Sequence, residues 1–390
     1  MNSKNVLIIA GEASGDLHGA SLIRELKKLD SSLKLFGIGG NKMQAEGMEL
    51  IYHIDKMAFL GFVEVIKHLP FIKKVQRHLI EEVKRRNVTD VVLIDYPGFN
   101  LSIAKNLKQL KPELVRQRRI ELIYYITPQV WAWGKGRVNK IRELFKKVLV
   151  VFPFEEKFFK EKNVNAEFVG HPLIQEINAY DFISRNLLDK KFDLDPAKKI
   201  LLILPGSRKQ EVKSIFPEAI KAASKIADEL DMQIVVACSS NIDEKVFYEL
   251  TDIKNFKVIK DQTYDLLKHA KFGIVKSGTS TLEAGLLELP MVIVYKTSLL
   301  TYAIGKSLVK IKNFGMANIV LDEQVVPELI QNEANADNIY DKAKNILSDE
   351  DMLNNIKLRL RRIRKILGDK NAPENAAKII YSLLNEHKAG

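Results

Sequence analysis

The feature that most constrains the fold is a regular alternation of short apolar runs with segments of helix length. In the first half, apolar runs occupy residues 6–10, 33–38, 91–95, 122–126, 148–152 and 167–170, and helix-length segments lie near 15–29, 73–86, 100–110, 136–145 and 154–161. The second half restarts the pattern with apolar runs at 200–204, 233–238, 256–259, 272–275 and 291–295. Strands that alternate with helices indicate parallel sheets covered on both faces.

Two such series in one chain predict an α/β protein with two Rossmann-like domains that face each other across a cleft. The length of 390 residues agrees, because single cores rarely grow past roughly 250–300 residues. We expect an N-terminal domain over 1–174, a C-terminal domain over 175–365, and a helical segment over 366–390 that packs back on the N-terminal domain. Open parallel sheets bind ligands beyond the carboxyl ends of their strands, so functional residues should directly follow strands.

The net charge of +12 is concentrated in one stretch of the chain. Residues 60–147 contain 19 Lys and Arg against 8 Asp and Glu, a net of +11. This excess suits nucleic acid, anionic lipid or a phosphorylated substrate, or else it reflects solvated helix faces.

Cysteine content and hydropathy bound the compartment. The single cysteine, Cys238, excludes an internal disulfide and fits a reducing cytosol. No run approaches the roughly 18 apolar residues of a transmembrane helix, and the first apolar run is too short for a signal peptide, which predicts a soluble or peripheral protein. No cluster of His, Cys and Asp has metal-ligand spacing, so we expect neither a metal nor a cofactor.

The turn after the first strand, GEASGDLHGA (11–20), has glycines at 11, 15 and 19 and leads into a helix. This arrangement is typical of a turn that holds phosphate. Glu12 and Asp16, however, place two negative charges where a pyrophosphate would be repelled. The turn therefore has the shape of a dinucleotide turn with charges that fit a different ligand.

Two turns of the second half have the better chemistry for a nucleotide. In LPGSRKQEV, a permanent cation, Arg208, follows a Pro-Gly turn and could neutralise a diphosphate, or it is an ordinary surface arginine. In VKSGTSTLEAG, small and hydroxyl residues lead into a helix whose N-terminus would attract an anion. Glu283 there either accepts hydrogen bonds from ribose hydroxyls or forms a capping box with Ser280.

Two motifs of the first half carry further candidates. Asp95 ends a buried strand in VVLIDYPGFN, where partial burial would raise its pKa toward that of a working base, unless it caps the next helix. Trp131 and Trp133 alternate with Lys135 and Arg137, which suits a sugar, nucleic acid or a lipid headgroup, or an ordinary core.

The stretch LGFVEVIKHLPFIKKVQRHL (60–79) mixes apolar residues with cations and so fits a helix in the interface of an anionic leaflet. The alternative is an amphipathic helix packed on its own sheet. The expected membrane contacts are Phe62, Val63, Ile66, Leu69, Phe71 and Ile72.

Taken together, AGEASGDLHGASLIREL, GIGGNKMQAEGMEL, FLGFVEV, IDYPGFN, YYITPQVWAWGKGRV, PFE, GHPL, LPGSRKQEV and SGTSTLEAG resemble the lipid-A-disaccharide synthase family, in family order from residue 10 to about 320. The resemblance implies an inverting glycosyltransferase of the two-Rossmann (GT-B) type. It further implies that UDP-2,3-diacylglucosamine is condensed with 2,3-diacylglucosamine 1-phosphate (lipid X) to give lipid A disaccharide 1-phosphate and UDP.

The resemblance also implies roles for residues. Asp95 is expected to deprotonate the 6-hydroxyl of the acceptor, with Glu12 and Asp16 as the other carboxylates considered; the family often has an acid where this chain has Gly98. The nucleotide-sugar contacts expected are Gly206, Ser207, Arg208, Ser277, Gly278, Thr279, Ser280, Glu283 and Asn318. Contacts to the acceptor or the reacting sugar are expected from Ser14, Gly15, His18 and Trp131, although the family often has an aliphatic residue in place of His18.

The expected partners are thus the two diacylated substrates, an anionic membrane surface and a second copy of the chain in a homodimer. The expected location is the cytoplasmic face of the inner membrane. The competing interpretations are another GT-B enzyme that uses UDP-GlcNAc, either a murein-precursor glycosyltransferase or a 2-epimerase, and a basic nucleic-acid-binding protein. The last lacks any recognition-helix or RNA-binding signature, so we expect no nucleic acid as partner.

Overall fold

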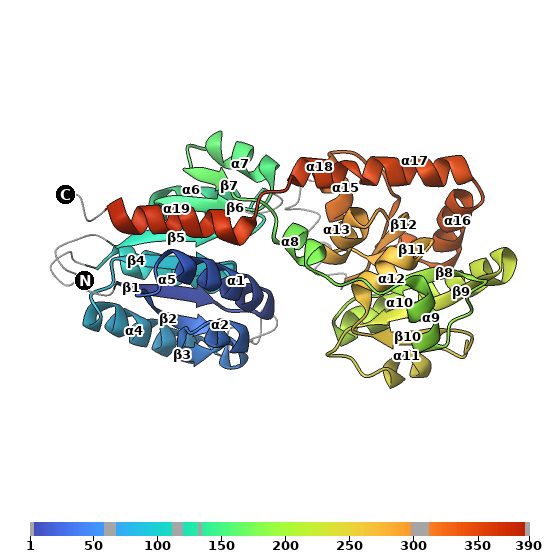
Figure 1. Ribbon diagram of the computed structural model, residues 1–390, viewed down its shortest axis with the longest axis horizontal. Coiled ribbons are helices and arrows are strands. Elements are labelled where there is room, and N and C mark those ends of the chain that lie inside the picture. Colours follow the sequence, from blue (N-terminus) through green and yellow to red (C-terminus); the bar gives the residue numbers. More distant parts are fainter. Residues whose placement is uncertain (1–3, 58–67, 111–119, 132–134, 298–311, 387–390) are drawn as a thin grey trace. The chain divides into compact units, whose positions relative to one another are not determined.

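The computed structural model describes residues 4–57, 68–110, 120–131, 135–297 and 312–386 (Figure 1). It divides into two compact units, each described by itself below. Unit 1 comprises Met1–Gln175 with Asp369–Gly390, and unit 2 comprises Glu176–Gly368. Each unit is a parallel sheet with flanking helices, so the predicted α/β class with two Rossmann-like halves is confirmed.

Unit 1 is built on a sheet whose paired strands are all parallel, in the order β3-β2-β1-β4-β5-β6-β7. The strands are β1 (Asn5–Ala10), β2 (Lys34–Gly39), β3 (Glu49–His53), β4 (Asp90–Ile94), β5 (Glu121–Tyr125), β6 (Lys147–Val150) and β7 (Ala166–Phe168). The helices are α1 (Ala13–Leu29), α2 (Asn41–Ala45), α4 (Leu69–Arg85), α5 (Pro97–Lys108), α6 (Lys135–Leu144), α7 (Pro153–Lys160) and α19 (Ala372–Glu386), with a 3-10 turn η1 (Ile54–Lys56).

Alternate side chains of each central strand enter two separate cores, because neighbouring residues of a strand point to opposite faces. Leu7 and Ile9 of β1 join the core formed with α4, α5, α6 and α7. Val6 and Ile8 join the core formed with α1 and α19. Central strands buried on both faces explain the unbroken apolar runs of the sequence.

The C-terminal helix α19 belongs to unit 1 although the chain reaches it from unit 2. It packs beside α1 on one face of the sheet, where Figure 1 draws it in red. Ala372, Ala376, Ala377, Ile380 and Leu384 are its buried residues. Small residues at two turns let the helix approach α1 and the sheet closely.

Unit 2 repeats the design with the order β10-β9-β8-β11-β12-β13, again all parallel. Its strands are β8 (Lys199–Leu204), β9 (Met232–Cys238), β10 (Lys257–Lys260), β11 (Phe272–Lys276), β12 (Met291–Tyr295) and β13 (Glu328–Ile330). Its helices are α9 (Arg185–Phe192), α10 (Lys209–Leu230), α11 (Lys245–Glu249), α12 (Thr263–His269), α13 (Thr279–Leu286), α15 (Met316–Leu321), α16 (Ala336–Leu347), α17 (Glu350–Leu360) and α18 (Arg362–Leu367), with η3 (Gln331–Glu333); α8 (Pro172–Asn178) spans the division between the units.

Two strands were not expected from the sequence. β3 and β13 each lie at the edge of their sheet, so they pair on one side only. β3 is largely half-exposed and pairs with β2 through a register shift, and β13 has only 3 residues. Short edge strands lack the buried apolar run by which the central strands are recognised.

Candidate functional site

Each sheet reverses its strand order at one place. The reversal falls between β1 and β4 in unit 1 and between β8 and β11 in unit 2. Ligands of open α/β sheets bind in the crevice outside the carboxyl ends of the strands at such a switch point. The candidate site residues are therefore those that follow β1 and β4, and those that follow β8 and β11.

The carboxyl ends of β1 and β4, with the turns that follow them, form the switch point of unit 1, which we call the β1–β4 edge. The turn after β4 has an unusual backbone conformation. Asp95 and Tyr96, directly after β4, have φ values of 46° and 47°, in the left-handed region that non-glycine residues rarely adopt. Asn100 donates its side-chain amide to the carbonyl oxygens of Ile94 (3.1 Å) and Asp95 (2.7 Å). Tyr124 donates its hydroxyl to the Asp95 carbonyl over 2.9 Å. These bonds over-determine the strained turn.

The Asp95 carboxyl has the properties expected of a base. Burial, together with the negative charge of Glu12, raises its pKa to about 6. Helix α5 begins at Pro97, its N-cap is Tyr96, and no side-chain bond caps it, so Asp95 is not used as a helix cap. Asn100, which the sequence offered as a competing cap of this helix, instead holds the turn through the carbonyls of Ile94 and Asp95, and Tyr124, which helps to hold it, was not singled out from the sequence.

The two acidic residues of the first turn differ in their tasks. Glu12 is exposed at the start of α1 and forms no side-chain cap bond. Asp16 is buried and accepts backbone N–H bonds from Gly40 (2.7 Å), Lys42 (3.1 Å) and Met43 (3.0 Å) at the start of α2. A carboxylate at a helix N-terminus satisfies otherwise unpaired donors and the helix dipole. These bonds occupy both oxygens of Asp16 and disfavour the catalytic role considered for it.

The expected acceptor contacts in the same turn lie at different depths. Ser14 is exposed in the first turn of α1, whereas Gly15 is buried, and a Cβ there would lie 3.1 Å from Ala10 Cβ. Burial, with help from the charge of Lys42, lowers the pKa of His18 to about 4. Burial and the nearby His18 likewise lower the pKa of His171 to about 3. Both imidazoles are therefore neutral at pH 7.

Trp131, another expected sugar contact, is half-buried and tied to an unexpected residue. Its Nε1 donates to Glu155 Oε1 over 3.0 Å, and its ring packs edge-on against Phe154 at 5.0 Å. Glu155 is 1% exposed, its Oε2 has no hydrogen-bond partner, and burial raises its pKa to about 8. The carboxyl is thus protonated at neutral pH. Only its place in the PFE motif marked this residue in the sequence.

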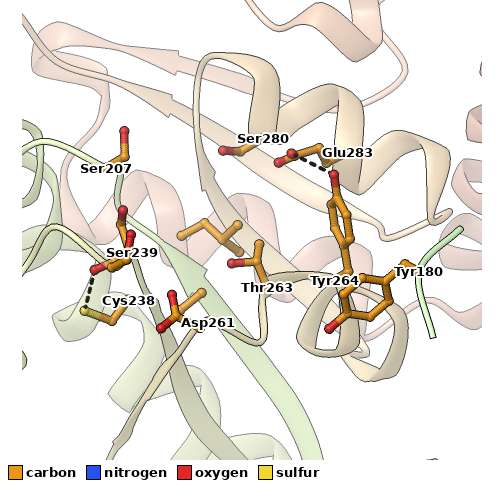
Figure 2. Close-up of a pocket in the computed structure, with 13 residues that line it drawn as sticks. Tyr180, Ser207, Cys238, Ser239, Asp261, Thr263, Tyr264, Ser280 and Glu283 are labelled. Atoms are coloured by element: carbon orange, nitrogen blue, oxygen red, sulfur yellow. Dashed lines mark hydrogen bonds between the residues drawn. The ribbon is translucent and has the colours of Figure 1, made fainter. Parts of the chain in front are cut away.

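In unit 2, a pocket of about 400 Å³ lies at the carboxyl ends of β8, β9 and β10 (Figure 2). Its lining includes four of the expected nucleotide contacts: Gly206, Ser207, Ser280 and Glu283. Residues that were not expected complete it: Tyr180, Leu204, Ala237, Cys238, Ser239, Ser240, Asp261, Thr263 and Tyr264. Hydroxyls, one carboxylate at each side and aromatic rings suit a polar ligand with a flat face.

Glu283 faces this pocket and does not form the capping box. Helix α13 begins at Thr279 with Gly278 as its N-cap, so Glu283 lies one turn inside the helix. Tyr264 donates its hydroxyl to Glu283 Oε1 over 3.5 Å, as Figure 2 shows. Burial and the charge of Glu176 raise the pKa of Glu283 to about 7. The capping interpretation of Ser280 and Glu283 is therefore wrong, and the carboxyl is available to a ligand.

The turn after β8 is organised by Glu211, which the sequence analysis did not single out. Its Oε2 accepts from the backbone N–H of Ser207 (3.2 Å) and Arg208 (3.3 Å). Its Oε1 lies 3.2 Å from the Arg208 guanidinium and 3.0 Å from Lys276 Nζ. Arg208 itself is exposed and does not line the pocket. The Glu211 carboxylate therefore binds the same N–H groups and cations that a phosphate group would use.

The remaining nucleotide candidates do not line the pocket. Ser277 is buried and donates to the Phe314 carbonyl (2.9 Å), Gly278 has a φ of 152°, and Thr279 is exposed. Asn318 is fully buried; its amide donates to Val326 O and Glu328 Oε1, and its oxygen accepts from the N–H groups of Val325 and Val326. All of its side-chain hydrogen-bonding groups are used within the fold. We therefore correct the expectation that Asn318 contacts the nucleotide. Its role is structural.

The expected membrane segment is described only in part. Phe62, Val63 and Ile66 lie outside the described residues. Helix α4 buries Val75, Gln76, Leu79 and Val83. Phe71 and Ile72 are half-buried and pack against the same core, so for this part the alternative of a helix packed on its own sheet is correct. Leu69 is 44% exposed at the start of the helix, with Lys73 and Arg77 exposed one and two turns later.

Two features are absent from the residues that the structure describes. None of their helices is long and apolar enough to cross a membrane. Nor do they contain a group of three or more His, Cys, Asp or Glu side chains that could hold a metal ion.

Known proteins similar to the chain point in one direction. A family model described as "Lipid-A-disaccharide synthetase" matches residues 6–380. A lipid-A-disaccharide synthase of Geobacter metallireducens is 36% identical over 389 residues, 99% of each chain. Among solved structures, a UDP-GlcNAc 2-epimerase from Neisseria meningitidis bound to UDP-GlcNAc has a TM-score of 0.64 at 13% identity, over 98% of this chain and 100% of that one. A calicheamicin glycosyltransferase has a TM-score of 0.63 at 14% identity over 100% of both chains. The solved structures show the GT-B fold alone.

Proposed function

The chain belongs to the lipid-A-disaccharide synthetase family, and we propose that its β1–β4 edge binds the acceptor while the unit 2 pocket binds the nucleotide of the donor. The protein is a UDP-sugar glycosyltransferase of lipid A synthesis. The substrates are a UDP-sugar donor and the acceptor lipid X, 2,3-diacylglucosamine 1-phosphate, and the finer proposal is that the donor is UDP-2,3-diacylglucosamine.

Asp95 is the general base in this proposal. Its carboxylate takes the proton of the acceptor 6-hydroxyl while that oxygen attacks the anomeric carbon of the donor opposite the diphosphate. The bond to UDP breaks, and the configuration at the anomeric carbon inverts. A pKa of about 6 leaves the carboxyl ionised at neutral pH yet still a useful proton acceptor. The observation that carries the proposal is this desolvated carboxyl on a strained turn at the switch point.

UDP is a fair leaving group, so the departing charge needs stabilisation more than protonation. We assign this task to the turn after β8 and to the start of α13. Arg208, Lys276 and the N–H groups of Ser207 and Arg208 now hold the carboxylate of Glu211. A diphosphate that displaced this carboxylate would meet the same cations and donors. Glu283, at the pocket wall, is assigned to the ribose hydroxyls.

Both substrates carry acyl chains, so the protein should work at a bilayer surface. We propose that the start of α4 contacts the cytoplasmic face of the inner membrane. The support is the exposed Leu69 with Lys73 and Arg77 on successive turns, together with the +11 excess of residues 60–147. Cations beside an exposed apolar residue fit an anionic interface.

The decisive experiment incubates the purified protein with the two diacylated substrates and identifies the product by mass spectrometry. We expect a disaccharide monophosphate with four acyl chains, formed in equal amount to UDP. Parallel incubations with UDP-GlcNAc alone, and with UDP-GlcNAc and a lipid-linked murein precursor, test the two competing GT-B activities. Product only in one of these parallel incubations would overturn the proposal.

A further inference from the structure

A cavity of about 600 Å³ in unit 1 lies between helices α5 and α6 and is not explained by the roles assigned above. Three cations line it: Lys105 from α5, and Arg137 and Lys140 from α6. Its apolar wall is formed by Leu101 and Leu144. We call this space the α5–α6 cavity. A cationic rim above an apolar wall is an arrangement that suits an anionic amphiphile.

The α5–α6 cavity begins beside the proposed base. Pro97 and Gly98, which line it, are the first two residues of α5 and follow Asp95 by two and three positions. The cavity therefore continues from the turn that carries Asp95. Arg137 is electrostatically coupled to the same turn, because its charge acts on the hydroxyl of Tyr124, and that hydroxyl bonds the Asp95 carbonyl.

The charges of the cavity are unbalanced. One carboxylate, Glu143, lines it together with the three cations. In the part of the chain that the structure describes, the side chains of Lys105 and Lys140 form no ion pair and no hydrogen bond with another residue. Both lysines are exposed, so their ammonium groups can turn toward a ligand without breaking a bond inside the protein.

A phosphate monoester is the ligand that this set of groups fits best. It carries close to two negative charges and three terminal oxygens at neutral pH. These oxygens can accept hydrogen bonds from one guanidinium and two ammonium groups. A monoester on a sugar also leaves room for acyl chains near the apolar wall. The acceptor of the proposed reaction has these parts, whereas the donor carries its phosphates in a diester-like diphosphate.

We propose that the α5–α6 cavity binds the phosphate monoester of the acceptor glycolipid and thereby makes the enzyme prefer a phosphorylated acceptor. This inference rests on the proposed function, since it concerns the acceptor that Asp95 deprotonates. The three cations act on binding and orientation of the acceptor, and they take no part in the transfer step itself.

The test compares two acceptors that differ only in the phosphate: 2,3-diacylglucosamine 1-phosphate and 2,3-diacylglucosamine. Both are assayed in neutral detergent, so that no anionic lipid surface contributes. For Lys105→Gln/Lys140→Gln we expect kcat/KM with the phosphorylated acceptor to fall by at least about tenfold, because hydrogen bonds between ionised groups are among the stronger ones. The value with the unphosphorylated acceptor should not change. Arg142→Gln, an exposed cation of α6 that does not line the cavity, is the matched control.

The outcomes separate the inference from the function on which it rests. If the double variant loses kcat/KM equally with both acceptors, or with neither, the inference is overturned. Disaccharide synthesis by the wild type would still uphold the proposed function. Loss that occurs only with anionic vesicles, and equally for both acceptors, would assign the lysines to the membrane surface. If the wild type forms no disaccharide, calorimetry without donor gives the affinities of the two acceptors instead. If the ratio of the affinity for the phosphorylated acceptor to that for the unphosphorylated one is the same in the double variant as in the wild type, the cavity is refuted as the phosphate site.

Discussion

The ring of Tyr96 occupies the space that the missing side chain of Gly11 leaves open. A Cβ at position 11 would lie 2.2 Å from Cδ1 of Tyr96 and 2.4 Å from Cγ. Gly11 directly follows β1 and Tyr96 follows β4 after one residue, so the contact joins the two strands of the switch point. Tyr96 also donates its hydroxyl to the Met57 carbonyl over 3.1 Å. The glycine is thus required for the turn that presents Asp95.

Gly11→Ala should therefore weaken both stability and turnover. Because the ring or the backbone must shift, we expect the free energy of unfolding to fall by about 1–3 kcal/mol, the usual cost of overpacking. Urea unfolding measures this loss. Gly136→Ala is the control, since a Cβ there meets nothing within 4 Å. Equal stabilities of the two variants would show that the Tyr96 contact yields easily.

Replacement of the two facing carboxyls distinguishes the base from its neighbour. Asp95→Asn should lower turnover by about 10²–10⁴-fold, the usual contribution of a general base, with UDP affinity retained. The pKa of Asp95, about 6, predicts an acid limb of kcat/KM near pH 6 for the wild type, and Glu12→Gln should keep most turnover but move this limb to lower pH. The sign follows because the charge of Glu12 raises the pKa of Asp95. If Glu12→Gln lost as much turnover as Asp95→Asn, the two roles would have to be exchanged.

Arg208 and Glu283 should affect nucleotide binding in different ways. Arg208→Ala should weaken UDP much more than uridine, because its proposed partner is the diphosphate. Glu283→Gln should weaken both, because its proposed partner is the ribose. Isothermal calorimetry with UDP and uridine gives the four affinities. Wild-type affinities in Glu283→Gln would refute the assignment of the unit 2 pocket to the nucleoside.

Glu155→Gln should alter how stability depends on pH. In the folded wild type, burial raises the pKa of Glu155 to about 8, well above the 4.5 of a solvent-exposed glutamate. Between these values the folded state holds a proton that the unfolded chain has released, so stability falls as pH rises, by up to about 1.4 kcal/mol per pH unit. The glutamine variant lacks this slope and should gain on the wild type from pH 5 to pH 9.

Urea unfolding at pH 5, 7 and 9 tests this expectation. The control is Glu156→Gln at the next position. Partial burial of Glu156 acts to raise its pKa, but the hydrogen bond from Lys160 and the other groups around the carboxylate together outweigh this effect, and the pKa is lowered. Glu156 therefore changes the pH dependence of stability only at pH values below 4.5, outside the tested range. Parallel stability curves for wild type and Glu155→Gln would mean that the carboxyl is already ionised in the fold.

Membrane attachment should depend on the start of α4. Phe62→Ser/Ile66→Ser/Leu69→Ser should sediment with anionic vesicles less than the wild type, and high salt should reduce binding of the wild type further. Lys73→Gln/Arg77→Gln should weaken binding at low salt, since each cation near an anionic surface contributes about 1 kcal/mol. Leu358→Ser in unit 2, where the leucine is 61% exposed, is the control. Binding that is unaffected by salt and by these substitutions would return α4 to a purely internal role.

Local patterns determined much of this protein in advance. Runs such as VLIIA and VVLI specify central strands because each residue of such a run is buried on one face or the other, and this requirement is visible in the run itself. The same logic marked Asp95, directly after β4, and Glu283, in the helix that follows β11, as candidate site residues. Strands β3 and β13 were not recognised, because β3 is largely half-exposed and β13 has 3 residues of which one is buried, so neither shows a buried apolar run.

The partners of the charged and polar residues were decided only by the tertiary structure. Asp16 was expected near the substrate, but it caps α2 through Gly40, Lys42 and Met43, which lie 24 to 27 positions away in the chain. The side-chain amide of Asn318 is likewise hydrogen-bonded to the backbone of the loop before β13. Burial of an apolar side chain is satisfied by many neighbours, so the sequence pattern suffices to predict it. A carboxylate needs particular donors at particular distances, and which donors it meets depends on how distant segments pack.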